Sequence, residues 1–95
     1  MDIAAFRSST ASDTPPAGLD KALTALWHDA RGDWDTAHKL AQAQHDETGA
    51  WVHAYLHRVE GDLPNAGYWY RRAGKPASTA PLTAEWEEIA TALLG

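Results

Sequence analysis

The fold is decided by residues 61–73, which read GDLPNAGYWYRRA. Gly61 stops one helix and Asp62 starts the next, because an aspartate before a helix accepts hydrogen bonds from its free backbone amides. Pro64 falls in the first turn, where its missing N–H costs no helical hydrogen bond. Apolar residues follow at helical spacing, which predicts an amphipathic helix with one packed face. They are Leu63, Ala66, Trp69, Tyr70 and Ala73.

The same pattern occurs earlier in the chain. When the sequence is shifted so that Gly32 meets Gly61, three further pairs coincide: His28 with His57, Asp33 with Asp62, and Ala37 with Ala66. Such repeats are typical of stacked helix hairpins, because one hairpin alone cannot bury both of its faces. We therefore expect an all-α fold of two stacked hairpins, with helices at residues 19–31 and 34–45, then 51–60 and 63–73.

Two segments flank these hairpins. After a linker rich in Ser, Thr and Pro, Thr83 is expected to cap a last helix that covers the open apolar face of the second hairpin. Residues 1–18 contain two adjacent prolines and almost nothing to bury, which predicts a flexible N-terminal tail. Only Ile3 and Phe6 in this tail could dock on the domain. Residues 19–95 are expected to form a single helical domain.

Composition limits the classes of function. The 95 residues include no Cys, which excludes a disulfide framework and a cysteine-ligated zinc or iron-sulfur site. Lys and Arg total 8 against 13 Asp and Glu, a formal net charge of -5 that argues against nucleic-acid binding. No apolar run approaches the ~20 residues that cross a bilayer. The first six residues lack the features of a signal peptide. We expect a cytoplasmic protein without a nucleic-acid or membrane partner.

Two stretches resemble known proteins. Residues 61–66 with residues 69–73 resemble the second half of a tetratricopeptide (TPR) repeat, and the segment WYRRA is equally similar to a Sel1-type repeat. The chain departs from the family where Thr24, His28, His53 and His57 stand in place of large apolar residues. This resemblance implies a TPR-like protein-interaction module. The stretch from residue 26 to residue 76 also resembles a group of small bacterial proteins, which implies a bacterial origin and nothing chemical.

A polar stripe on the helix at 51–60 is a candidate metal site. His53, His57 and Glu60 are spaced so that their side chains line one face of the helix. Two histidines one turn apart can bind one divalent metal ion, and Glu60 can act as an oxygen ligand or accept a hydrogen bond from a ligand. His28, which matches His57 in the repeat, could complete a three-histidine set. The alternative is a structural stripe in which His57 pairs with Glu60 or Asp62.

The same stripe allows an enzymatic hypothesis. His53 or His57 could act as a general base beside an orienting carboxylate, since imidazole titrates near neutral pH. However, the sequence contains no nucleophile elbow, P-loop or glycine-rich dinucleotide turn. The residues therefore favour a binding protein over an enzyme, and a divalent metal is the one cofactor that they suggest.

A second candidate surface is basic and aromatic. Tyr and Arg are enriched at interface hot spots, and Arg pairs with carboxylates through two hydrogen bonds. Such residues gather on or beside the helix at 63–73 and predict a surface for a protein or an acidic peptide. The alternative is a solvated helix end whose cations complement the helix dipole. Exposed apolar surface elsewhere would favour a homodimer. The residues of this surface are Arg58, Tyr68, Arg71, Arg72 and Lys75.

Overall fold

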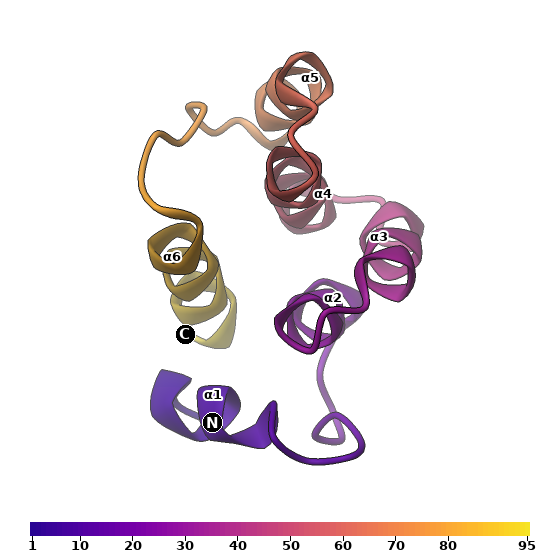
Figure 1. Cartoon of the computed structure of the whole chain (residues 1–95), viewed down its shortest axis with the longest axis vertical. Helices are drawn as coiled ribbons and strands as arrows, with labels where there is room; N and C mark the ends of the chain where they lie inside the picture. The colour runs from indigo at the N-terminus through magenta and orange to yellow at the C-terminus, as the bar shows by residue number, and fades with distance from the viewer.

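A computed structural model describes all 95 residues, which form six helices and no strand. Adjacent helices pack in pairs, α2 with α3 and α4 with α5, and α4 is central because it also packs against α2, α3 and α6 (Figure 1). None of the six combines the length and the apolar character that a membrane span requires. The helices are α1 (Ile3–Ser9), α2 (Lys21–Ala30), α3 (Trp34–Ala43), α4 (Glu47–Val59), α5 (Leu63–Ala73) and α6 (Leu82–Leu94).

Aspartate caps start five of these helices. Each carboxylate accepts a hydrogen bond from the backbone N–H three residues later, which satisfies one of the free donors of the first turn. The caps are Asp2, Asp20, Asp33, Asp46 and Asp62. Asp33 and Asp62 confirm the expected caps, whereas Asp46 starts α4 four residues before the helix expected at 51–60. The cap expected at Thr83 is wrong, because α6 begins after Pro81 without a side-chain cap.

The two turns identified from the repeat have the same geometry. Gly32 and Gly61 have φ values of 80° and 85°, a left-handed conformation that only glycine adopts without strain. The following residue bonds back in both turns: Asp33 N–H donates to the carbonyl of His28 at 3.0 Å, and Asp62 N–H donates to that of His57 at 2.9 Å. The internal equivalence of these two stop-and-cap segments is therefore confirmed.

Helix α6 covers a different surface from the one expected. It lies on the side of α2 and α4 away from α3, and it also contacts α1 (Figure 1). The indole N–H of Trp86 donates to the carbonyl of Leu26 at 2.9 Å, and Ile89 is fully buried. Helix α6 therefore closes the core between the two helix pairs instead of extending the second pair. Leu63, placed on an apolar face by its spacing, is 64% exposed because it stands at the very start of α5.

The N-terminal segment packs on the domain through Phe6, one of the two residues of this segment that could dock there. Residues 3–9 form α1, and the fully buried ring of Phe6 stacks on Trp86 with ring centroids 5.5 Å apart. A hydrogen bond reinforces this packing, because Trp27 Nε1 donates to the carbonyl of Ser9 at 3.1 Å. The composition of residues 1–18 predicted a tail because most of these residues are small or polar. One aromatic side chain, that of Phe6, is enough to anchor the segment at a gap in the core.

Candidate functional site

Three histidines from two helices lie together between the helix pairs. His38 comes from α3, and His53 and His57 come from successive turns of α4. Nε2 of His53 is 2.9 Å from Nε2 of His38, and one ring nitrogen from each of the three residues lies within 4.8 Å of the others. His53 and His57 are buried, while His38 is partly buried. We refer to His38, His53 and His57 as the histidine cluster.

Two tryptophans cover the ends of the histidine cluster. Trp34 stacks on His38 with ring centroids 4.8 Å apart and an interplanar angle of 11°. Trp69 stacks on His53 at 3.9 Å and 18°. The indole N–H of Trp34 donates to the carbonyl of Leu56 at 2.8 Å, which fixes that ring against α4. The two indoles therefore hold the imidazole planes in place and shield them from water.

Two polar neighbours fix the orientation of His57. Nδ1 of His57 lies 2.6 Å from Oε1 of Glu60, and Nδ2 of Asn65 lies 3.3 Å from Nε2 of His57. Because the amide of Asn65 donates and the carboxylate of Glu60 accepts, these bonds assign the ring proton to Nδ1 and a lone pair to Nε2. Of the two carboxylate partners considered for His57 in the structural alternative, Glu60 and Asp62, the structure shows Glu60. Metal-binding histidines commonly make the same bond to a carboxylate.

Burial favours the neutral imidazoles of His38 and His53. Burial, with smaller contributions from His38 and His57, lowers the pKa of His53 to about 4. Burial and then His57 also lower the pKa of His38, although Glu60 and Asp35 act in the opposite direction. A neutral imidazole keeps the lone pair that a metal ion needs. His38 and His53 are thus in the ligand form at neutral pH.

His28 does not belong to the histidine cluster. It lies in the last turn of α2, with its ring at the edge of Trp27 and the ring centroids 5.0 Å apart. His38, and not His28, lies beside His53 and His57. The repeat could not reveal His38, because it aligns with Gly67 in the second helix pair. One available signal was its position four residues after Trp34, on the helix face that carries that inward-pointing residue.

The structure removes Arg58 from the predicted basic surface. Its guanidinium donates to Oε1 of Glu85 at 2.9 Å and to the carbonyl of Ala80, and its side chain is 15% exposed. Oε2 of Glu85 accepts a 2.5 Å hydrogen bond from Tyr70. A carboxylate as buried as Glu85 needs a cation, and Arg58 is that cation. The guanidinium of Arg58 is therefore already paired inside the protein.

The other four residues of that surface are exposed on or next to α5. Nη1 of Arg72 donates to the hydroxyl of Tyr68 at 3.0 Å, and its guanidinium lies 5.3 Å from the ring centroid of Trp69. Nζ of Lys75 lies 4.3 Å from the ring centroid of Trp51. None of these cations forms an ion pair with a carboxylate. We refer to Tyr68, Arg71, Arg72 and Lys75 as the α5 surface.

No family model, curated protein or solved structure matches this chain. The role of the protein therefore has to be inferred from the chemistry of its own residues. Two groups of side chains carry the chemistry that the sequence pointed to: the buried imidazoles of the histidine cluster and the exposed cations of the α5 surface.

Proposed function

We propose that this protein binds a divalent transition-metal ion through His38, His53 and His57. The observation that supports this most directly is the mutual distance of at most 4.8 Å among one ring nitrogen of each residue. In a tetrahedral zinc site, Zn–N bonds of about 2.0–2.1 Å separate neighbouring ligand nitrogens by about 3.3 Å. The 2.9 Å between Nε2 of His38 and Nε2 of His53 is close to that spacing. Small side-chain rotations would complete the site.

The donor set favours a site with an open coordination position. Three imidazoles supply three of four tetrahedral positions and leave the last to water or another small ligand. Imidazole nitrogen suits zinc, copper and nickel better than calcium or magnesium, which prefer oxygen. Glu60 would remain bound to Nδ1 of His57, which directs Nε2 toward the ion. On metal binding, Nε2 of His57 exchanges the weak donor Asn65 for the ion.

The decisive experiment is a zinc titration that compares His38→Ala with His28→Ala. Wild-type protein, purified without a tag, should bind one equivalent of Zn²⁺ and melt at a higher temperature with it, because the ion binds only the folded state. His38→Ala should weaken binding by at least about tenfold, since it removes a ligand. His28→Ala is the matched control, because it removes a histidine outside the cluster, and it should bind as the wild type does.

Folding and binding can be separated in the same variants. His38 is only partly buried, so His38→Ala should keep the helical circular-dichroism spectrum of the wild type in chelator. Cu²⁺ should quench tryptophan emission in the wild type, because Trp34 and Trp69 stack on the cluster. A wild-type protein with neither stoichiometric zinc nor a shifted Tm contradicts the proposal. An unchanged zinc affinity in a folded His38→Ala variant would also contradict the proposal.

A second candidate function is protein binding. We propose that the two helix pairs form a TPR-like module whose α5 surface binds an acidic peptide or a C-terminal carboxylate. Support comes from the lack of a carboxylate partner for Arg71, Arg72 and Lys75 beside Tyr68, which is 43% exposed. Because α6 covers the face formed by α2 and α4, the partner would bind outside that face.

Peptide titration tests this second candidate. A fluorescent peptide of Asp and Glu with a free C-terminus should bind the wild type, and added salt should weaken it. Arg71→Ala with Arg72→Ala should lower the affinity at least about tenfold, as expected when paired Arg hot spots are removed. Lys21→Ala with Lys39→Ala removes the same charge from α2 and α3 and serves as the control. If the two double variants bind the peptide with equal affinity, the α5 surface is a solvated helix end and not a binding site.

A further inference from the structure

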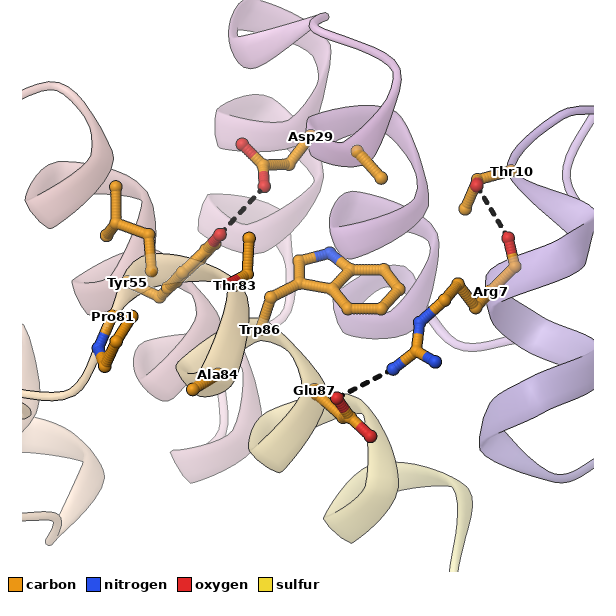
Figure 2. Close-up of a pocket in the computed structure, with 11 residues that line it drawn as sticks. Arg7, Thr10, Asp29, Tyr55, Pro81, Thr83, Ala84, Trp86 and Glu87 are labelled. Atoms are coloured by element: carbon orange, nitrogen blue, oxygen red, sulfur yellow. Dashed lines mark hydrogen bonds and ion pairs between the residues drawn. The ribbon is translucent and has the colours of Figure 1, made fainter.

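A cleft between α1, α2, α4 and α6 belongs to neither of these functions. Figure 2 shows it with Asp29 and Tyr55 at one end and the pair Arg7 and Glu87 at the other. Its volume of about 660 Å³ falls within the range of small-molecule sites, roughly 300–1,000 Å³. The indole of Trp86 lies between the two ends (Figure 2).

One carboxylate in this cleft has no cation. Asp29 is partly buried, and its hydrogen-bond donor is the hydroxyl of Tyr55 at 3.2 Å. By contrast, Glu87 pairs with Arg7 at 2.7 Å. Arg31, which follows Asp29 closely on the chain, directs its guanidinium to the carbonyls of Thr10 and Ser12. The cleft therefore carries one uncompensated negative charge, located at Asp29.

The negative charge of Asp29 is unfavourable when no ligand is bound. Burial raises the pKa of Asp29, and the hydrogen bond from Tyr55 only partly opposes this effect. A cation placed against the carboxylate would stabilise its ionised form. The face of an indole also attracts cations, and the N–H of Trp86 is already used by the carbonyl of Leu26. Asp29 thus attracts one positive group, and the nearby indole of Trp86 does not repel it.

The rest of the lining is suited to an apolar group. Pro81, Leu82 and Ala84 from the start of α6 form one wall, next to Trp86. A ligand that satisfies both parts of the lining has a positive group at one end and an apolar body at the other.

We propose that this cleft binds a small organic amine with an apolar body. Its ammonium group pairs with the carboxylate of Asp29, and its apolar body lies on Trp86 and the first turn of α6. An anionic ligand would be repelled by Asp29, and a neutral one would leave that carboxylate without a cation. The site lies apart from His38, His53 and His57, so it does not depend on metal binding.

The test uses phenethylamine and its neutral counterpart 2-phenylethanol. In chelator at neutral pH, phenethylamine should shift the indole N–H resonance of Trp86 in a saturable manner. The alcohol should bind at least about tenfold more weakly, because it lacks the charge that pairs with Asp29. Asp29→Asn should lower the affinity for the amine by a similar factor. Asp35→Asn is the matched control, because it removes one exposed negative charge from α3.

Asparagine keeps the size of Asp29 and an oxygen that can accept from Tyr55, so the variant should retain the fold, as its circular-dichroism spectrum would show. Three results would overturn the proposal. They are equal affinity for the amine and the alcohol, equal amine affinity in Asp29→Asn and Asp35→Asn, and no saturable shift of Trp86 at millimolar amine.

Discussion

The hydrogen bond between Nδ1 of His57 and Glu60 shows how a single residue can set the chemistry of a site. With the ring proton held at Nδ1, the lone pair of His57 is on Nε2, the nitrogen away from Glu60. All buried side-chain nitrogen and oxygen atoms of the chain have hydrogen-bond partners. His38 and His53 therefore pair with each other, and His57 pairs with Glu60 and Asn65, without a metal.

The depressed pKa of His53 predicts a protein that loses stability in mild acid. Its pKa is about 4 in the folded chain and about 6.5 when unfolded. Between these values only the unfolded chain binds the proton. The free energy of unfolding should therefore fall as pH decreases from 6.5 to 5, by an amount on the order of 2 kcal/mol. Urea unfolding in chelator at pH 7, 6 and 5 measures the change in the free energy of unfolding. Roughly 1.4 kcal/mol corresponds to one pKa unit.

A variant isolates the contribution of His53 from that of the carboxylates. His53→Gln cannot take up the proton, so its stability should depend less on pH than that of the wild type over the same interval. His45→Gln changes an exposed histidine outside the cluster and should follow the wild type. If His53→Gln and the wild type lose stability in parallel, the acid sensitivity has another origin.

At the scale of helices, α6 is attached by an ion pair as well as by apolar packing. Glu85 stands in its first turn, is 2% exposed, and bonds to Arg58 of α4 and Tyr70 of α5. Because each partner comes from a different helix, the interaction fixes the position of α6 relative to the second helix pair.

Arg58→Ala should therefore be strongly destabilising. It would leave the carboxylate of Glu85 buried without a cation, which typically costs about 3–5 kcal/mol. Arg7→Ala removes the exposed pair with Glu87, whose side chains are 53% and 51% exposed, and should cost at most about 1 kcal/mol. Chemical denaturation of both variants gives the comparison. Similar losses in the two variants would contradict the structural role given to Arg58.

At the scale of the whole molecule, a small chain completes its core with a short terminal helix. The Cα radius of gyration is 12.0 Å, and few large side chains are fully buried. A domain of this size buries a smaller share of its surface than a large one, so each aromatic residue contributes more. Phe6 closes the space beside Trp86 and thereby joins the first residues to α6 near the end of the chain.

Phe6→Ala tests whether α1 is part of the folded domain. Truncating a fully buried Phe typically costs about 3–5 kcal/mol, so the variant should melt well below the wild type. Thr14→Ala changes an exposed residue of the same segment and should leave the Tm within about a degree or two, consistent with small surface effects. Scanning calorimetry measures both. Equal Tm values for Phe6→Ala and the wild type would show that Phe6 does not anchor α1 to the folded domain.

The sequence by itself determined the local structure of this protein. Helical spacing and the Gly-Asp pairs at 32–33 and 61–62 predicted the all-α class and both equivalent turns, because capping and φ preferences act over a few residues. Spacing along α4 likewise identified His53 and His57, because side chains one turn apart share a face.

Only the tertiary structure decided which elements meet. It brought His38 and not His28 to the cluster, turned Arg58 inward to Glu85, and seated α6 and Phe6 on the core. These outcomes depend on how whole helices pack against one another, which is set by the shape and charge of surfaces far apart in the chain. No spacing within a single helix carries that information.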